Sequence, residues 1–192
     1  MSSIFSDPFF RRGNTLLGGE LIEVDTAGSP IAGNEIVGQV KAFQDVHPAS
    51  RGERYSNRLV FCVAARYKGS TVSDASTVAG ELYLFDTGKP LTEFTSKATA
   101  TNATAGLAIG VLDEYLTGEL RQNDIVWLVV KGPTSIKRTA AAVNSGVAVQ
   151  ASATAGSIAT LSTGIAIGQQ IVGANTSASA GLTRVNLHSD EI

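Results

Sequence analysis

Long apolar runs in the middle of the chain predict β-strands that are buried on both faces. Residues 59–67 are almost continuously apolar, and residues 124–131 combine β-branched residues with the single tryptophan. The glycine-proline pair at 132–133 predicts the end of the second run. A shorter run at 81–85 is followed by turn-forming residues at 86–90 and predicts another strand. The middle of the chain therefore has the pattern of a β-rich protein.

The N-terminal half contains weaker strand signals and a polar loop. Residues 20–24 and 35–43 have the composition of strands, and residues 47–58 predict a loop. The loop and its flank carry the basic residues Arg51, Arg54, Arg58, Arg66 and Lys68. We expect these side chains to be solvated or paired with acidic neighbours, although a phosphate-binding patch would have the same composition. The one helix signal is a short turn within 111–120 that Gly118 would end.

The second half of the chain contains a long segment without charge. Residues 139–183 include no Asp, Glu, Lys or Arg, and stretches of them alternate apolar with hydroxyl or amide residues. Such alternation predicts half-buried strands. Isolated β-domains normally protect their surfaces and edges with charge. We therefore expect this face to be packed against something, within the chain or in an oligomer; a disordered tract would have fewer apolar residues.

A short sequence occurs twice and suggests an internal repeat. Residues 105–110, Ala-Gly-Leu-Ala-Ile-Gly, are similar to residues 163–168, Thr-Gly-Ile-Ala-Ile-Gly. Each copy is followed by a loop and then by an apolar segment, at 125–130 and at 182–187. The pattern predicts a repeated β-unit with glycines at bends, although two copies of so simple a motif also arise by chance.

Residues 1–15 predict an extended N-terminal arm. Phe5, Phe9 and Phe10 lie in an otherwise polar segment, so they require an apolar environment on their own domain or on a neighbouring subunit. Trp127 is the other candidate interface residue, with a place in the core as the alternative. The remaining residues, 16–192, predict one β-rich domain, and a division of it into two units, 16–97 and 98–192, stays open.

Composition favours the all-β class and excludes several kinds of partner. Gly, Ala, Ser, Thr and Val are abundant in the second half, and segments of good helix formers are few. The net charge of −2 and the pI near 5.7 give no electrostatic footprint for nucleic acid or membrane. Without a recognisable signal peptide or a run of about 20 apolar residues, we expect synthesis in the cytoplasm. The single cysteine, Cys62, forms no intrachain disulfide and is expected in the core.

Catalytic and metal-binding constellations are missing from the sequence. His47 and His188 are the two histidines, and neither has a second ligand at metal-binding spacing. The chain contains no Gly-x-Ser-x-Gly elbow and no phosphate-binding glycine loop. Asp113 and Glu114 are adjacent carboxylates, but neighbours on a strand point to opposite faces. We therefore expect no enzymatic activity, no cofactor and no metal.

Residues from about 98 to 187 resemble the head decoration, or cement, proteins of tailed bacteriophages. The resemblance rests on the Gly-Leu-Ala-Ile-Gly segment, the strand at 125–133, the turn and strand at 144–149, and the final stretch from 167 to 187. It implies a β-barrel or β-sandwich unit that associates as a homotrimer. It also implies that the protein clamps neighbouring major capsid proteins on the outer surface of the virion.

Two other functions fit the same sequence. One is a structural component of a phage tail, baseplate or fibre base, which would also be a repetitive β-rich assembly protein. The other is a carbohydrate-binding β-module, for which Tyr55 and Tyr67 beside the basic loop are the candidate aromatic residues.

Overall fold

The computed structural model describes residues 36–46, 54–103, 109–139, 146–163, 165–170 and 181–187. The described strands are β1 (Val40–Val46), β2 (Arg54–Tyr67), β3 (Leu82–Phe85), β4 (Glu93–Lys97), β5 (Ile109–Leu112), β6 (Ile125–Arg138), β7 (Ala148–Ala151), β8 (Ile158–Thr160), β9 (Gly168–Gln170) and β10 (Gly181–Leu187). Helical structure in these ranges is limited to the 3-10 turn η3 (Ala75–Thr77) and the four-residue helix α1 (Ala100–Ala103). The all-β class expected from the sequence is confirmed.

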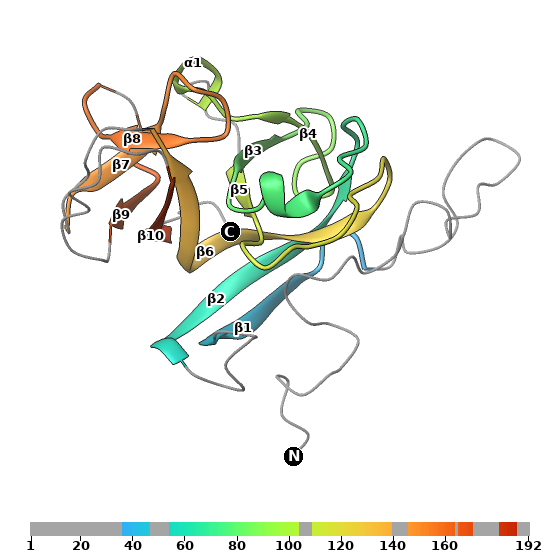
Figure 1. The fold of residues 1–192 in the computed structure, drawn as a ribbon, viewed down its shortest axis with the longest axis horizontal. Helices are drawn as coiled ribbons and strands as arrows, with labels where there is room; N and C mark the ends of the chain where they lie inside the picture. The colour runs from blue at the N-terminus through green and yellow to red at the C-terminus, as the bar shows by residue number, and fades with distance from the viewer. Residues whose placement is uncertain are drawn as a thin grey trace, which may run out of the picture.

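Five of the described strands close into a first barrel. The neighbours run β2-β4-β3-β5-β6, and β6 pairs back onto β2. Most of these pairs are antiparallel, whereas β2 and β4 run parallel through Arg66–Glu93 and Tyr67–Phe94. In Figure 1 this barrel is the green and yellow half of the molecule. The ring pairs every one of its strands on both sides, which removes exposed strand edges from this part of the fold.

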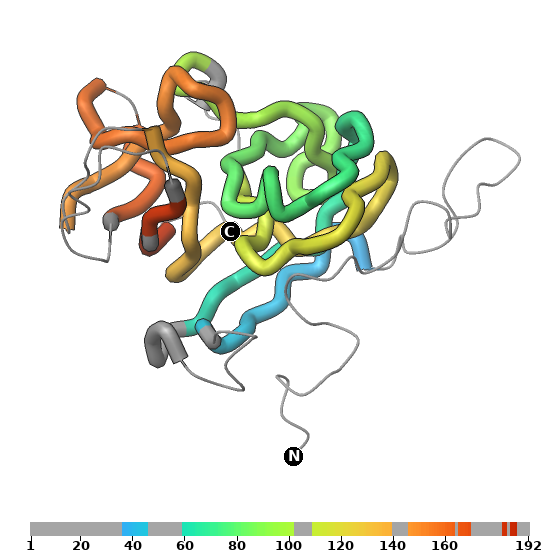
Figure 2. Tube along the Cα trace, in the orientation of Figure 1, coloured from blue at the N-terminus to red at the C-terminus, as the bar shows by residue number. Residues whose placement is uncertain are grey.

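A second barrel begins where the first one ends, on the same strand. Within the described ranges, the neighbours run β6-β10-β9-β7-β8, and β8 closes the ring through a parallel pair between Arg138 and Ile158. The first half of β6 belongs to the first barrel and its second half to the second barrel. Figure 2 shows the orange and red chain of the second barrel beside the green and yellow chain of the first.

Strand β6 continues through the glycine-proline pair at which the sequence predicted its end. Gly132 has a φ of +99° and lies so close to β2 that a Cβ there would be 2.4 Å from the Leu59 carbonyl oxygen. The pairing between β2 and β6 shifts register at this point, between Phe61 and Cys62. Beyond the bend, Pro133 lies opposite Asn186 of β10. A bulge and a permissive glycine therefore turn the strand from one barrel into the next without ending it.

The two barrels share one strand plan, and the registers agree except at two bulges of the first barrel, between Phe61 and Cys62 and between Tyr83 and Phe85. Taking β2 through β6 as equivalent to β6 through β10, both the order of neighbours and the parallel closing pair coincide. In the first barrel Gly110 lies opposite Tyr83, and in the second Gly168 lies opposite Val149. These two glycines end the repeated sequence segments, so the two segments occupy equivalent positions in the two rings. The two rings meet inside β6.

The described residues form two clusters of buried apolar side chains. One cluster takes residues from all five strands of the first barrel and fills its interior with aromatic rings, among them Tyr67, Tyr83 and Phe94. The other joins the outer face of the first barrel to the interior of the second. Cys62 belongs to this second cluster and is fully buried, as expected for a core thiol. The shared cluster makes the two barrels one packed unit.

Several local predictions need correction. Strand β1 begins at Val40, since residues 36–38 form a turn, and β2 already begins at Arg54 inside the predicted loop. Residues 111–120 complete β5 and then form turns, so the short helix is wrong: Leu112 pairs with Leu128 of β6. Tertiary pairing with β6 outweighs the weak local helix preference here. The predicted arm at 1–15 and strand at 20–24 lie outside the described residues.

Candidate functional site

The second barrel exposes neutral side chains in its described ranges, and we call this set of residues the neutral surface. Its exposed residues are Ala153, Thr154, Ala155, Thr160, Ser162, Thr163, Ile165, Ala166, Gln169 and Leu182. Ile165 and Leu182 are large apolar residues that are 51% and 48% exposed. Small side chains lose little conformational entropy on burial, and their hydroxyl and amide groups still form hydrogen bonds. This composition suits contact with another protein surface better than permanent exposure to water.

The first barrel has a different surface. Its exposed side chains include the charged residues Asp74, Lys89 and Glu119, and Glu119 forms an ion pair with Arg121 at 2.8 Å. Charge of both signs on the surface keeps a β-domain soluble and discourages edge-to-edge association. The contrast between the two barrels therefore places the candidate interface on the second barrel.

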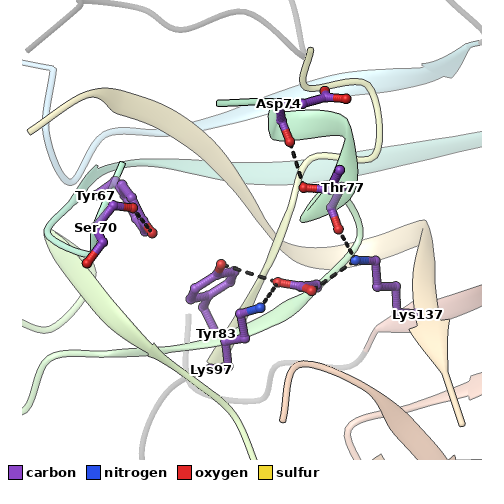
Figure 3. A network of polar contacts seen from close by, with 8 residues as sticks. Tyr67, Ser70, Asp74, Thr77, Tyr83, Lys97 and Lys137 are labelled. Carbon is purple, nitrogen blue, oxygen red and sulfur yellow. Dashed lines mark hydrogen bonds and ion pairs between the residues drawn. The ribbon is translucent and has the colours of Figure 1, made fainter. Parts of the chain in front are cut away.

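A buried carboxylate fixes the second barrel against the first (Figure 3). Glu81, next to β3, is only 7% exposed. Its carboxylate forms one ion pair with Lys97 Nζ at 2.7 Å and a second with Lys137 Nζ at 2.9 Å. Lys137 lies on the second half of β6 and also donates to the carbonyl oxygen of Thr77. One charged side chain from the second barrel is thus bonded to two places on the first.

The same carboxylate affects a tyrosine inside the first barrel. The hydroxyl of Tyr83 donates to Glu81 Oε2 at 3.3 Å. Burial raises the pKa of Tyr83 well above its ordinary value, and the charge of Glu81 raises it further. This phenol is therefore neutral at physiological pH and serves as a hydrogen-bond donor, with no role as a base.

Backbone hydrogen bonds complete the junction. The turn between β7 and β8 docks on the first barrel: Leu82 N donates to Gly156 O, and Gly156 N donates to Ala98 O, both at 2.9 Å. Lys137 N donates to Gly80 O at 2.9 Å. Gly156 has a φ of +78°, and a Cβ there would lie 3.3 Å from Glu81 Cβ. Close backbone contact together with the ionic contacts holds the neutral surface in a fixed orientation.

Of the interface residues predicted from the sequence, Trp127 lies within the described ranges. Trp127 is 1% exposed and packs edge-to-face against Phe43, with ring centroids 5.2 Å apart. Its ring therefore lies in the core of the described chain. Phe5, Phe9 and Phe10 lie outside the described residues.

Two side chains of the basic stretch, Arg66 and Lys68, form hydrogen bonds within the described fold. Arg66 is 2% exposed and donates from its guanidinium to the carbonyl oxygen of Asn123 at 3.1 Å. Burial lowers the pKa of Arg66, while Glu93 acts in the opposite direction. Lys68 Nζ donates to Asn123 Oδ1 at 2.8 Å. These two cations support a loop, which favours the expected structural role over a phosphate-binding patch.

The described residues assemble no metal-binding cluster, since no three His, Cys, Asp or Glu side chains approach one another closely enough. The carboxylate of Asp113 is buried and accepts a hydrogen bond from the Tyr115 backbone N–H, which identifies it as part of a turn. Tyr67, one of the two aromatic residues considered for carbohydrate binding, is 5% exposed and packs inside the first barrel. In the described part of the chain, no helix has the length and apolar character that crossing a membrane requires.

The described residues form an all-β protein of two fused barrels, and the exposed side chains of the second barrel are neutral. Comparison with known proteins gives no match: no family description, no curated sequence and no solved structure is similar to this chain. The sequence indicated the neutral segment from its lack of charge. It contained no signal for the junction, because Glu81, Lys97 and Lys137 are far apart in the chain and each resembles an ordinary surface residue.

Proposed function

We propose that this protein is a structural virion subunit that decorates and stabilises a tailed-phage head by binding across neighbouring major capsid proteins. The observation that carries the proposal is the neutral surface of the second barrel. Protein interfaces are depleted of charge at their centres, and small side chains allow two surfaces to approach closely. The resemblance of residues 98–187 to decoration proteins covers the whole second barrel and supports the same proposal.

The rigid junction supports a clamping role. A subunit that strengthens a shell must resist deformation between the points that it binds, and the Glu81 junction and the shared core join the barrels in that way. Weak contacts become effective when they are repeated over a shell, because each bound copy raises the effective concentration of the next contact. The proposal includes association of the copies as a homotrimer.

Co-sedimentation with empty shells tests the proposal. The shells would be assembled from a tailed-phage major capsid protein, and bound protein would be measured over a concentration series. Thr163→Lys places a charge on the neutral surface and is expected to weaken binding at least about tenfold, because the charge must be desolvated. Thr117→Lys makes the same change at an exposed position of the first barrel and is expected to bind like the wild type.

Each alternative outcome is informative. Failure of the wild type to bind shells, together with binding to tail tubes or baseplates, would replace the head assignment with a tail assignment. If Thr163→Lys bound shells as well as the wild type does, the neutral surface would not be the surface that contacts the shell.

A further inference from the structure

Strand β1 borders β2 on one side and no described strand on the other. Every other described strand belongs to one of the two closed rings. In Figure 1, β1 and the start of β2 form a ribbon that extends away from both barrels. The edge of such a ribbon offers backbone donors and acceptors, which natural proteins normally pair or cover.

The register identifies which backbone groups of β1 point away from β2. Ala64 N donates to Gln39 O at 3.0 Å, next to the first paired residue of β1. Bonded positions alternate in an antiparallel ladder, so Lys41 and Phe43 also bond to β2. The positions between them are directed at the open edge, and they are Val40, Ala42 and Gln44. All three lie in the regular part of the ladder, because the register of β1 shifts only beyond Gln44.

One face of the ribbon beside this edge is apolar and partly exposed. Residues that lie directly opposite one another share a face, so Val40 and Ala42 are on the same side as Leu59 and Phe61. Val40 is 41% and Leu59 is 42% exposed, and Phe61 is half-buried against the core of the first barrel. Two-stranded ribbons are marginally stable in water by themselves. A third strand that brings aliphatic side chains to this face is therefore the occupant that the edge fits.

The segment predicted as a strand at 20–24 precedes β1 in the same chain. Its sequence, Glu-Leu-Ile-Glu-Val, places Ile22 and Val24 on one side of a strand. The structure describes the chain from Ile36, and residues 25–39 connect the segment to β1. This connection contains turn-forming glycine and proline, so it can reverse the direction of the chain. Its short length gives the segment a high effective concentration at the edge, which favours it over a strand from another molecule.

One register uses the whole open edge. Antiparallel pairing of Ile22 with Ala42 also sets Val24 opposite Val40 and residue 20 opposite the third open position. Both aliphatic side chains then join the apolar face of the ribbon, whereas a slip of one residue would turn them away from it. A slip of two residues would run the segment into the turn that precedes β1 or past the register shift at its end.

We propose that residues 20–24 add to the open edge of β1 of their own chain as an antiparallel third strand, with Ile22 opposite Ala42. The addition pairs the edge and removes it as a site of association between copies. It places residue 20 at the far end of the ribbon, where β2 begins. The preceding segment, with Phe5, Phe9 and Phe10, then starts from this tip and is directed away from both barrels. The inference does not depend on the capsid assignment.

Hydrogen exchange of individual amides, followed by NMR on the full chain, tests this pairing. Ile22→Pro removes the N–H that donates to the Ala42 carbonyl oxygen in the proposed register. Glu23→Pro is the matched control, because the N–H of residue 23 points away from β1 and proline is tolerated there on an edge strand. The Ala42 amide is expected to exchange at least about tenfold faster in Ile22→Pro than in the wild type and in Glu23→Pro.

The amide of Phe43 is the internal reference, since it bonds to β2 and is expected to stay protected in all three proteins. Rapid exchange of the Ala42 amide in the wild type would overturn the pairing without the need for a variant. Equal protection of this amide in the wild type and Ile22→Pro would overturn it as well. The protection is expected to be the same at every protein concentration. Protection that grows with concentration would assign the edge to a second copy and would also overturn the proposal.

Discussion

The first barrel fills its interior with aromatic rings, whereas the second barrel, on the same strand plan, uses aliphatic side chains and a buried arginine. The equivalent interior positions are Tyr67 and Arg138, Tyr83 and Val149, Phe85 and Ala151, and Phe94 and Ile158. Strand order and most of the register are therefore shared by the two barrels, while the side chains that pack inside them differ. Different sets of side chains can fill the same barrel if their total volume suits the space.

The surfaces of the two barrels differ as well. Charged residues such as Asp74 and Lys89 are exposed on the first barrel, whereas the exposed residues of the described second barrel are neutral. We interpret this as a division of roles within one repeated architecture. The first barrel supplies a rigid, well-packed base, and the second presents the surface available for contact with another protein.

Removing a ring from the first barrel is expected to have the largest effect on stability. Phe94 is fully buried and contacts both Tyr67 and Tyr83, with centroid distances of 5.3 and 5.2 Å. Phe94→Ala is expected to lower the free energy of unfolding by about 3 to 5 kcal/mol, because it creates a cavity where a ring packed. Denaturant unfolding measures the change.

The equivalent variant, Ile158→Ala, shows whether the barrels unfold together. Since one apolar cluster spans both barrels and β6 belongs to both, we expect each variant to shift a single cooperative transition. Two separate transitions, with Phe94→Ala affecting only one of them, would show that the barrels are independent and would contradict the idea of a rigid base.

The repeated glycines allow a matched test of the strand plan. A Cβ on Gly168 would lie 2.5 Å from the carbonyl oxygen of Asn186, so β10 must move to accommodate it. Gly168→Ala is expected to cost about 2 to 3 kcal/mol, as overpacking against backbone does. At Gly110 the nearest atom is Leu128 Cβ at 3.0 Å, and Gly110→Ala is expected to cost about 1 kcal/mol. If thermal unfolding showed the same loss of stability for both variants, the backbone of the second barrel would move aside at Gly168 more easily than its contacts indicate.

The junction between the barrels is expected to contribute less. Glu81→Gln removes both ion pairs but keeps the size of the side chain. Because Lys97 and Lys137 are 38% and 30% exposed, the solvent screens the interaction, and we expect a loss of about 1 to 2 kcal/mol. Glu119→Gln, at an exposed pair with Arg121, is the control and is expected to cost less than about 0.5 kcal/mol. If Glu81→Gln and Glu119→Gln lost similar amounts of stability, the ion pairs of Glu81 would contribute no more than an exposed surface pair does.

The sequence predicted those strands whose pattern is local. Residues 59–67 and 82–85 are strands because their apolar character alone requires burial, and the glycine-ended repeats mark β5 and β9. The lack of charge between 139 and 183 likewise indicated the candidate surface before its geometry was known.

The sequence could not predict how the strands close into rings. Ring closure depends on two short parallel contacts, between β2 and β4 and between β6 and β8, which join residues far apart in the chain. Alternation along a strand shows which side chains share a face but does not identify the neighbouring strand. The continuation of β6 past Pro133 has the same origin, since pairing with β10 outweighs the local stop signal.

The smallest expected change in stability concerns the buried tyrosines inside the first barrel. Burial raises the pKa of Tyr83 and also of Tyr67, with the charge of Glu81 adding to both shifts. A raised folded-state pKa means that the stabilising contribution is complete below the ordinary tyrosine pKa of about 10 and is lost as the pH rises above it, because the unfolded chain ionises first. The free energy of unfolding should therefore fall in strongly alkaline solution.

Lysines also deprotonate in this range, so the comparison must be made with Tyr83→Phe. At neutral pH this variant is expected to lose up to about 1 kcal/mol, because the bond from the phenol to Glu81 is removed. Above a pH of about 10, its stability should fall less steeply than that of the wild type. In the wild type, Tyr83 ionises in the unfolded chain but not in the folded one, and the variant lacks this phenol. Parallel pH profiles for the two proteins would show that Tyr83 ionises as freely in the folded state as in the unfolded state. The first barrel would then be open to water, and the contrast between a tightly packed base and a contact-forming second barrel would no longer hold.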